Sequence, residues 1–471
     1  MKIAPSLAVT VVLIALPCAF GQKARPAGSN SSDAVPAETE PGIPVTDKLT
    51  VERCGSCHKA DSKRNLTRIS WIRTTPEGWE EAIKRMVRLN GLTLTPDDAR
   101  HILAYLAKDH GLAPEETAAN RWYLEIRQPE AEPVPNNQVR IACGSCHAFA
   151  RPQTWRRSAT EWRLLVNMHL GYFPVSEFNS FHARPRENGS GFGPAPGLLV
   201  SANGGPPTRD PVDEALDYLD KNEGLHSSAW SNWRASMTDP DLTGRWIVSA
   251  SSPGKGRFFG VMTITQGATA DLFATETTLT RAADGSKISF TGQSVIYTGY
   301  EWRGRSKTET IPAVREVMTV SADHATIEGR WFWGGYQEFG FNVVARRESA
   351  DITVIGTDIA SIHAGSKGVA IKILGDRFPR GLTPSDINMG SGVYVTKVIA
   401  IKPNEISVLA DVDSSVVSGF RSVSVKSRTA PDAFAVYDKI DYIKVSADSA
   451  LAHLGGTTHP KGYVQFEAIA Y

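Results

Sequence analysis

The feature that most constrains this chain is a five-residue motif that occurs twice. Cys-Gly-Ser-Cys-His spans residues 54–58 and returns at residues 143–147. Two thiols three positions apart can each form a thioether to one haem vinyl group, and the histidine that follows then lies under the iron as its proximal ligand. The motif therefore predicts two covalently bound haem c groups. They are expected on Cys54, Cys57, Cys143 and Cys146, with His58 and His147 as the proximal iron ligands.

The amino terminus has the pattern of a secretory signal peptide, which we expect to occupy residues 1–21. Residues 7–16 form its apolar core, and residues 19–21 are a small-x-small cleavage site. Export predicts a periplasmic protein, and it suits covalent haem attachment. A lipoprotein anchor at Cys18 is the weaker alternative, because Pro17 stands where a small residue is needed. No other stretch approaches the ~20 apolar residues of a membrane-spanning helix.

The cysteines and the net charge argue against a disulfide-bonded, nucleic-acid-binding or membrane-surface protein. Cys18 leaves with the signal peptide and the two motifs use the other four cysteines, so none remains for disulfides. Two Cys-x-x-Cys pairs could also form a structural zinc site or disulfides, but a histidine directly after each pair favours haem. The formal net charge of +1 gives no reason to expect nucleic acid or an anionic membrane as a partner.

The sequence predicts that the first half of the chain is mainly helical. Residues 22–45 are rich in Pro, Ala, Ser and Glu, which predicts a flexible linker. Residues 46–238 predict a dihaem cytochrome c domain of two α-helical units, at 46–120 and 135–230, because the order of motif, loop, helix and closing helix repeats. The second unit carries an insertion within residues 172–209, which predicts a long loop that either binds a partner or only covers the haem edge.

The second half of the chain reads as β-structure. Short runs of alternating apolar residues, separated by turn residues, begin near residue 241. They predict an antiparallel β-barrel at residues 239–349 and an immunoglobulin-like β-sandwich at residues 350–430. A second immunoglobulin-like module is expected at residues 431–471, and we expect it to be incomplete. The fold class is therefore multidomain, α-helical first and then all-β.

The sixth iron ligands follow from aligning the two units by their tryptophans. Met86 follows Trp79 at the spacing at which His169 follows Trp162, so both lie two turns on along equivalent helices. We therefore predict His58 and Met86 on the first iron, and His147 and His169 on the second. Met168 is the open alternative to His169, since only one of two adjacent helical side chains can face the iron. The other candidates are His182, which is the best of them, His226, and the two expected surface residues His101 and His110.

The ligand difference predicts unequal haem potentials. Thioether sulfur favours ferrous iron, so the His/Met haem should have the higher potential and the pair should form an ordered electron relay. Several arginines follow the motifs closely, and we expect one or more of them to neutralise haem propionates. These arginines are Arg68, Arg73, Arg156 and Arg157. Trp71 and Trp155 are expected to pack on the haem faces.

The whole arrangement resembles the alpha subunit of quinohemoprotein amine dehydrogenase. The resemblance rests on the two Cys-x-x-Cys-His units, the helix from Pro76-Glu77-Gly78-Trp79 to Arg85-Met86, its counterpart from Trp162 to His169, and the β modules that follow. It implies a periplasmic heterotrimer with a beta-propeller subunit and a small gamma subunit. It further implies that the gamma subunit carries a cysteine tryptophylquinone, which oxidises a primary amine.

The resemblance implies that the chain is an electron-transfer subunit. Its two haems take electrons from the quinone and pass them to a soluble cytochrome or an azurin-like copper protein, so no catalytic residue is expected here. We find no nucleophile elbow, HExxH motif or phosphate loop in the sequence. Two alternatives stay open: a dihaem peroxidase-like enzyme with one open haem iron, and a haem-based binding or sensor protein.

Overall fold

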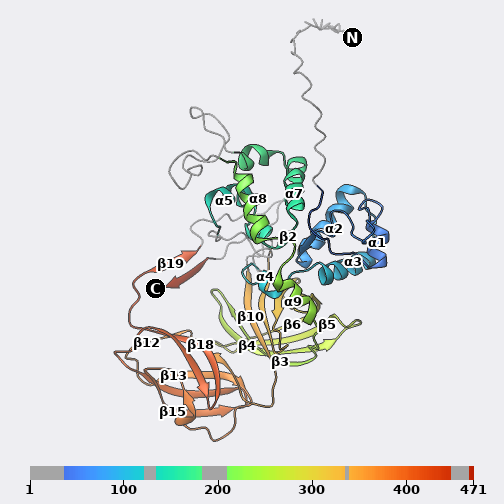
Figure 1. The fold of residues 1–471 in the computed structure, drawn as a ribbon. Coiled ribbons are helices and arrows are strands. Elements are labelled where there is room, and N and C mark those ends of the chain that lie inside the picture. Colours follow the sequence, from blue (N-terminus) through green and yellow to red (C-terminus); the bar gives the residue numbers. More distant parts are fainter. Residues whose placement is uncertain (1–36, 121–133, 183–208, 335–338, 447–453, 455–465) are drawn as a thin grey trace, which may run out of the picture. The chain divides into compact units, whose positions relative to one another are not determined.

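The computed structural model describes residues 37–120, 134–182, 209–334, 339–446, 454 and 466–471 (Figure 1). The predicted signal peptide and most of the predicted insertion lie outside the described residues. The predicted linker is wrong at its end. Ile43 and Val45 are buried, and their N–H groups donate to the carbonyl oxygens of Ser70 and Arg64 at 2.8 and 3.0 Å. Val45 belongs to the hydrophobic core of the first helical unit. The polar residues around it in the sequence concealed this.

The first helical unit is built from short, well-capped helices. It comprises α1 (Lys48–Cys54), strand β1 (Ile72–Thr74), α2 (Pro76–Asn90), α3 (Pro96–Asp109) and α4 (Pro114–Thr117). The Asp47 carboxylate accepts from the Thr50 N–H at 2.7 Å and so starts α1 where it can deliver Cys54. Thr75 and Thr95 cap α2 and α3, each followed by proline in the first turn. Gly91, with φ at 73°, ends α2 in the left-handed region that favours glycine.

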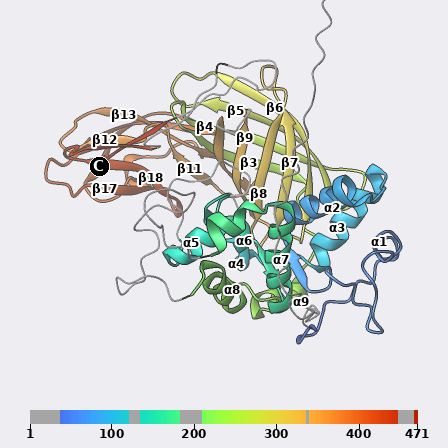
Figure 2. The ribbon, with the colours of Figure 1, turned by 90° about the horizontal axis from the view of Figure 1, so that it is seen from above.

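The second helical unit repeats this order. It comprises α5 (Asn137–Gly144), α6 (Ala150–Gln153), strand β2 (Trp155–Arg157), α7 (Ala159–Tyr172), the π-helix η1 (Glu177–Phe181), α8 (Pro211–Asn222) and α9 (Ser228–Ser236). Asn136 caps α5, which carries Cys143, and Ser158 caps α7. Figure 2 shows α5 to α8 in green and α1 to α3 in blue.

Equivalent hydrogen bonds show that the two units share one plan. The indole N–H of Trp79 donates to the carbonyl oxygen of His110 at 2.9 Å, and that of Trp162 donates to the carbonyl oxygen of Glu223 at 3.3 Å. His110 and Glu223 are the capping residues that end α3 and α8. The tryptophan thus connects α2 to the end of α3 in the first unit, and α7 to the end of α8 in the second.

The two units are joined through β1 and β2. These strands pair antiparallel, with Arg73 opposite Arg156 and Thr74 opposite Trp155. The N–H of Thr74 donates to the His110 carbonyl oxygen at 3.0 Å, and that of Arg157 donates to the Glu223 carbonyl oxygen at 3.2 Å. Equivalent strands of the repeat therefore form one small sheet between the units.

The predicted antiparallel barrel is confirmed as a closed, eight-stranded one. It comprises β3 (Gly244–Ser252), β4 (Gly256–Gln266), β5 (Leu272–Arg281), β6 (Lys287–Tyr297), β7 (Glu301–Lys307), β8 (Val314–Val320), β9 (Thr326–Trp333) and β10 (Phe339–Arg347). Each strand pairs with its neighbour in sequence, and β10 closes the barrel on β3. Trp246, Trp302 and Trp331 are almost fully buried within it, so side chains fill its interior.

The barrel is tied to the end of the first helical unit. The Thr298 hydroxyl donates to the Ala107 carbonyl oxygen at 2.9 Å, and the Tyr300 hydroxyl donates to the Leu112 carbonyl oxygen at 3.0 Å. Both acceptors lie at the end of α3 or just after it. The barrel therefore covers the end of α3.

Two packed sheets follow the barrel. One sheet has the order β11-β13-β16-β15 and the other β12-β18-β17-β14, and both contribute to one hydrophobic core. The strands are β11 (Thr353–Thr357), β12 (Ser361–His363), β13 (Val369–Asp376), β14 (Ile387–Asn388), β15 (Val393–Lys402), β16 (Glu405–Val412), β17 (Gly419–Val425) and β18 (Arg428–Tyr437), with the 3-10 helix η2 (Pro384–Asp386) before β14. The immunoglobulin-like assignment of this sandwich stays a prediction.

The boundary predicted between residues 430 and 431 is wrong. It cuts through β18, whose pairing with β17 and β12 keeps residues 431–437 in the sandwich. The apolar alternation continues across that point, because Ala430, Ala433 and Phe434 all enter the same core. Beyond it, β19 (Ile443–Ser446) pairs antiparallel with β20 (Glu467–Ala470).

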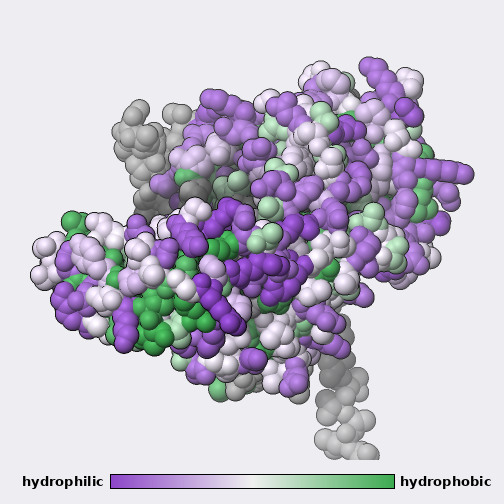
Figure 3. All heavy atoms as spheres, turned by 90° about the horizontal axis from the view of Figure 1, so that it is seen from below, coloured by the Kyte–Doolittle hydropathy of each residue, from purple (hydrophilic) through white to green (hydrophobic). Residues whose placement is uncertain are grey.

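The surface carries exposed apolar side chains. Figure 3 shows hydrophobic residues gathered in a patch among hydrophilic ones on the face drawn there. The sandwich exposes Tyr394 and Ile399 on its edge strand β15, and Val417 and Phe420 before and on β17. An exposed edge with apolar residues is a typical surface for another chain. Within the described residues, no helix is long and apolar enough to cross a membrane.

Candidate haem-binding site

The first motif lines a cavity of about 890 Å³. Cys54, Cys57 and His58 lie on its lining, and Met86 reaches the same cavity from α2. The structure therefore brings together all four residues predicted for the first haem. Much of the remaining lining is apolar and comes from the surrounding helices and loop. It includes Ile69, Ile72, Trp79, Ile83, Ile102 and Leu106.

His58 is prepared to bind a metal through Nε2. Its Nδ1 lies 2.8 Å from the carbonyl oxygen of Thr67. A carbonyl oxygen can only accept, so Nδ1 carries the proton and Nε2 keeps its lone pair. Burial lowers the pKa of His58, and the nearby Arg68 cation lowers it further against the opposing effect of the Thr67 hydrogen bond. The imidazole is therefore neutral at pH 7, as iron ligation requires.

The second motif lines a separate cavity of about 450 Å³. Cys143 and His147 lie on its lining, and His169 reaches it from α7. Cys146 is exposed and is not among the lining residues. His169 resembles His58 in one contact, because its Nδ1 lies 2.9 Å from the Leu165 carbonyl oxygen and donates to it.

Burial keeps the first thiol of each motif, Cys54 and Cys143, protonated. Burial raises the pKa of Cys54 to about 11, with a further contribution from Cys57. Burial raises the pKa of Cys143 to about 12. The described cysteines form no disulfide. Within the described part of the chain there is also no group of three or more His, Cys, Asp or Glu residues that could hold a bare metal ion.

Met168 and His169 occupy different positions relative to the cavities. His169 lines only the second of the two cavities, whereas Met168 lines both of them. The His169 ring also has its centroid 5.9 Å from that of Phe181 and 6.1 Å from that of Phe173. Both residues thus reach the second cavity, and His169 as the iron ligand stays a prediction.

The other candidate histidines lie away from both cavities. His101 is half exposed and lies 2.9 Å from Asp47, His182 lies 2.8 Å from Asp210, and the ring of His226 contacts the carbonyl oxygen of Pro41 at 2.7 Å. None of them lines either cavity.

The expectation that His110 lies at the surface is wrong. Its side chain is fully buried, and it packs against the rings of Trp79 and Tyr105. Burial lowers its pKa to about 3, and the Arg234 cation adds to this, so the ring is neutral. The indole N–H of Trp79 donates to the His110 carbonyl oxygen at the end of α3, and the same indole lies edge-on against the buried ring.

Arg73 and Arg156 do not line either cavity, which contradicts a propionate role for them. Arg73 is fully buried and binds both carboxylate oxygens of Glu116 at 2.9 Å. Arg156 lies 3.3 Å from Glu116 and 2.6 Å from Glu223. The pairing of β1 with β2 sets the two arginines opposite each other, and two carboxylates between the units compensate the two cations.

The two glutamates differ in their protonation. Burial would raise the pKa of Glu116, but the hydrogen bonds and charge of Arg73 outweigh it and lower that pKa to about 2. Burial dominates at Glu223 and raises its pKa to about 7, against the attraction of Arg156. The sequence reasoning missed both residues. Glu116 shows a local signal, since it follows Pro114 as the third residue of α4, but that signal does not identify a partner in another segment.

Arg68 and Arg157 are the arginines that reach the cavities. Arg68 lines the first cavity, and Arg157 lines both. Trp155 also lines both cavities, and its packing on a haem face stays a prediction. Trp71 lines neither, and its indole N–H donates to the Glu40 carbonyl oxygen at 2.9 Å, so that expectation is wrong for Trp71.

These residues fit haem. Each cavity is largely apolar, lies within the ordinary size range of cofactor sites, and carries motif thiols beside an imidazole. His58 offers a neutral Nε2 to the first cavity, and the imidazole of His169 reaches the second. Arg68 and Arg157 also bring cations to the cavities, as the two propionates of a haem would require.

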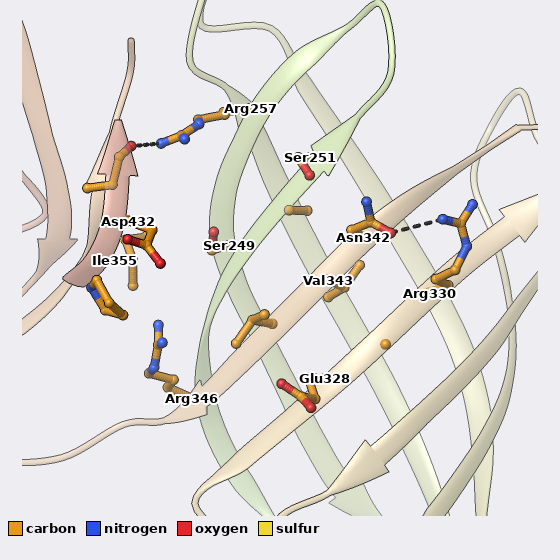
Figure 4. Close-up of a pocket in the computed structure, with 15 residues that line it drawn as sticks. Ser249, Ser251, Arg257, Glu328, Arg330, Asn342, Val343, Arg346, Ile355 and Asp432 are labelled. Carbon is orange, nitrogen blue, oxygen red and sulfur yellow. Dashed lines mark hydrogen bonds between the residues drawn. The ribbon is translucent and has the colours of Figure 1, made fainter. Parts of the chain in front are cut away.

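A third cavity, of about 450 Å³, has a different character (Figure 4). It lies against the outer face of β3, β9 and β10, and residues 431–433 of the sandwich complete it. Its lining is polar, and within it Arg330 donates to Asn342 at 3.0 Å while Arg257 donates to the Ala433 carbonyl oxygen. It contains no residue of either motif.

Comparison with known protein families agrees with the geometry. Residues 45–189 match the haem-binding domain of the alpha subunit of quinohemoprotein amine dehydrogenase. Residues 239–348 match domain II of the same subunit, and residues 347–438 match domain III. The chain belongs to this family. The quinohemoprotein amine dehydrogenase alpha subunit is a haem-binding chain of an oxidoreductase, and as one subunit of a complex it has partner subunits.

Other comparisons add little to this membership. No curated protein matches the chain. Solved structures of small β-barrels resemble part of it, including EF1p2_mFAP2b bound to DFHBI, at 14% identity and a TM-score of 0.20 over 23% of this chain and 94% of that one. The redesigned barrel b11L5F_LGL is 15% identical, with a TM-score of 0.20 over 23% of this chain and 92% of that one. Neither similarity bears on the function of a quinohemoprotein amine dehydrogenase alpha subunit.

Proposed function

We propose that this chain is the dihaem electron-transfer subunit of a periplasmic quinohemoprotein amine dehydrogenase. The observation that carries the proposal is the pair of adjoining cavities, each of which holds motif residues and a second candidate iron ligand on an equivalent helix. A haem bound in each cavity would supply a one-electron iron couple.

The chain's own residues would hold and tune these haems. Cys54 and Cys57 would attach the first haem, with His58 and Met86 as its axial ligands. Cys143 and Cys146 would attach the second, with His147 and His169 as its axial ligands. A thioether ligand favours the ferrous state relative to a second imidazole, so the first haem would have the higher potential.

The wall between the cavities supports electron transfer from one haem to the other. Trp155, Leu165 and Met168 line both cavities, so single side chains separate the two sites. Oxidation of one primary amine to an imine releases two electrons, and two haems can accept one each. The relay would therefore match the stoichiometry of the reaction on the partner.

We assign amine oxidation to a cysteine tryptophylquinone on a gamma subunit, beside a beta-propeller subunit. The electrons would leave for a soluble cytochrome or an azurin-like copper protein. Exposed apolar residues on the sandwich, such as Tyr394 and Phe420, support contacts with other chains. The signal-peptide pattern of residues 1–21 supports the periplasm.

Reconstitution tests the proposal. The haem-loaded chain, mixed with the quinone-bearing partner, is expected to show reduced haem bands after a primary amine is added. An amine that reduces the quinone while both haems stay oxidised would contradict the proposal. Low-temperature EPR of the oxidised chain is expected to show one His/Met and one bis-His low-spin signal.

Two other functions make different predictions. A peroxidase-like enzyme requires one high-spin haem that reacts with cyanide or peroxide, whereas each cavity here offers a second candidate ligand. A sensor that holds a ligand in the barrel requires an open interior, whereas Trp246, Trp302 and Trp331 fill it. Both observations favour electron transfer.

A further inference from the structure

The wall between the two haem cavities holds more positive charge than its neighbours balance. Six side chains line both cavities, and two of them are arginines. The six are Arg85, Trp155, Arg157, Leu165, Met168 and Tyr172. Arg157 belongs to β2, so the small sheet that joins the two helical units also fixes its position.

Arg157 is buried with one ion-pair partner, which lies beyond hydrogen-bond distance. Its side chain is only 5% exposed, and its guanidinium carbon lies 4.4 Å from the centre of the Trp155 ring and 5.5 Å from that of Trp162. Its nearest ion-pair partner is Glu161, at 3.7 Å, which is too far for a hydrogen bond. Its Nε–H has no hydrogen-bond partner among the described residues. A buried cation in this state is costly unless an anion completes the site.

The neighbouring charges do not supply that anion. Oxygen Oε2 of Glu161 serves both Arg157 and Arg68, which lies 3.1 Å away. Arg85 also acts on Arg157, and Glu38 lies next to Arg68. Burial lowers the pKa of Arg157 to about 9, the charges of Arg68 and Arg85 add to this, and Glu161 only partly opposes it. Glu81 also lines the second cavity and acts on Arg85, but it pairs with Arg151. The cluster of Arg68, Arg85 and Arg157 therefore has more cations than the two carboxylates Glu161 and Glu81 can balance.

We infer that Arg157 binds a haem propionate at the shared wall and that its charge raises the midpoint potentials of both haems. The inference rests on the proposed function, since it requires a haem in each cavity. Ferric haem carries one more positive charge than ferrous haem, so a nearby buried cation disfavours the ferric state. Arg157 is a positioning residue that acts on the two haems together. Arg68, which lines the first cavity only, acts on the first haem alone.

Redox titration of the haem-loaded full chain tests this inference. Arg157→Gln removes the shared charge, and Arg68→Gln removes the charge of the first cavity. Arg163→Gln is the matched control, because Arg163 lies on α7, is exposed, donates only to the Ala159 carbonyl oxygen of its own helix, and lines neither cavity. Haem content is measured first, so that a chain without two haems counts against the proposed function and not against this inference.

The expected result separates the three variants. In R157Q the equilibrium constant for reduction of each haem falls at least tenfold, which is a downward shift of ~59 mV for a one-electron couple. In R68Q only the first haem shifts, and in R163Q neither haem shifts. Two haems at wild-type potentials in R157Q would overturn the inference.

Other outcomes are also decisive. If R157Q does not keep both haems, Arg157→Lys carries the test, because lysine keeps the positive charge. Both haems are then expected at wild-type potentials, and a downward shift of both haems in a fully loaded R157K chain overturns the inference. Wild-type potentials that move with chloride concentration would assign a free anion to Arg157 in place of the propionate, and would also overturn it.

Discussion

The two helical units share a backbone plan and differ in the side chains placed on it. In both, a capped helix carries a buried tryptophan whose indole donates to the carbonyl that ends the closing helix. The first unit ends that helix with His110, which is neutral, and the second ends it with Glu223, whose pKa burial raises to about 7. Met86 and His169 lie at equivalent positions on α2 and α7, and each lines the cavity of its own motif. The comparison shows that the repeated hydrogen bonds fix the frame, while the chemistry of each unit depends on a few side chains.

The largest effect is expected from removal of one attachment site. Replacement of Cys54 and Cys57 by serine should leave one haem per chain, because the second cavity has its own motif and ligands. Replacement of Cys143 and Cys146 should leave the other haem. The alkaline pyridine spectrum gives the haem content of each variant. A loss of both haems from either double variant would show that the units do not load independently.

Exchange of the candidate ligands should make the two units more alike. Met86→His should lower the potential of the first haem, and His169→Met should raise that of the second. Each shift should exceed ~59 mV, which is a tenfold change in the equilibrium constant for reduction. Spectroelectrochemistry and EPR check both shifts. Met168→Leu is the control, since it should leave the EPR signals unchanged. A change of ligand signal in M168L with none in H169M would assign the iron to Met168.

The two buried glutamates should respond differently to neutralisation. Glu116→Gln should lower the free energy of unfolding at pH 7 by ~3 kcal/mol, because it leaves Arg73 buried without its carboxylate. Glu223→Gln should cost about 1 kcal/mol, because Glu223 is already half protonated near pH 7 and Arg156 keeps Glu116. Urea unfolding at pH 7 measures both values.

The pH dependence of the same variants has a definite sign. The lowered pKa of Glu116 means that its contribution to stability is complete above its ordinary pKa of 4.5 and is lost as pH falls toward about 2. The raised pKa of Glu223 means that stability is lost as pH rises from 4.5 through about 7. E116Q should therefore flatten the acid limb of the stability curve, and E223Q the limb between pH 4.5 and 7. Equal curves for the two variants would contradict the difference between the units.

The smallest effect is expected at the caps of α2 and α7. Thr75→Ala and Ser158→Ala should each lower the free energy of unfolding by about 1 kcal/mol, because each hydroxyl accepts from a backbone N–H in the first helical turn. The Ser158 bond is the shorter, at 3.1 against 3.3 Å, and S158A should cost slightly more. Thermal unfolding of both variants beside wild type measures the difference. A larger loss in T75A would reverse this order.

The sequence by itself determined what is local. The Cys-x-x-Cys-His motifs, the helix starts at Asp47, Thr75 and Thr95, and the alternating strands of the barrel all depend on residues a few positions apart. Caps and periodicity act over one or two turns, so they can be read without knowing the fold. The alignment of Trp79 with Trp162 also placed Met86 and His169 at equivalent positions, which the structure shows beside the first and second cavities.

Only the tertiary structure decided which side chains face which cavity. The sequence does not distinguish three arginines that follow the motifs. The pairing of β1 with β2 buries Arg73 and Arg156 against the carboxylates between the units. It leaves Arg157 on the lining of both cavities. His110 was misplaced for the same reason, since the indole that covers it lies on another helix. Charge compensation and burial depend on segments far apart in the chain, and no local pattern encodes those distances.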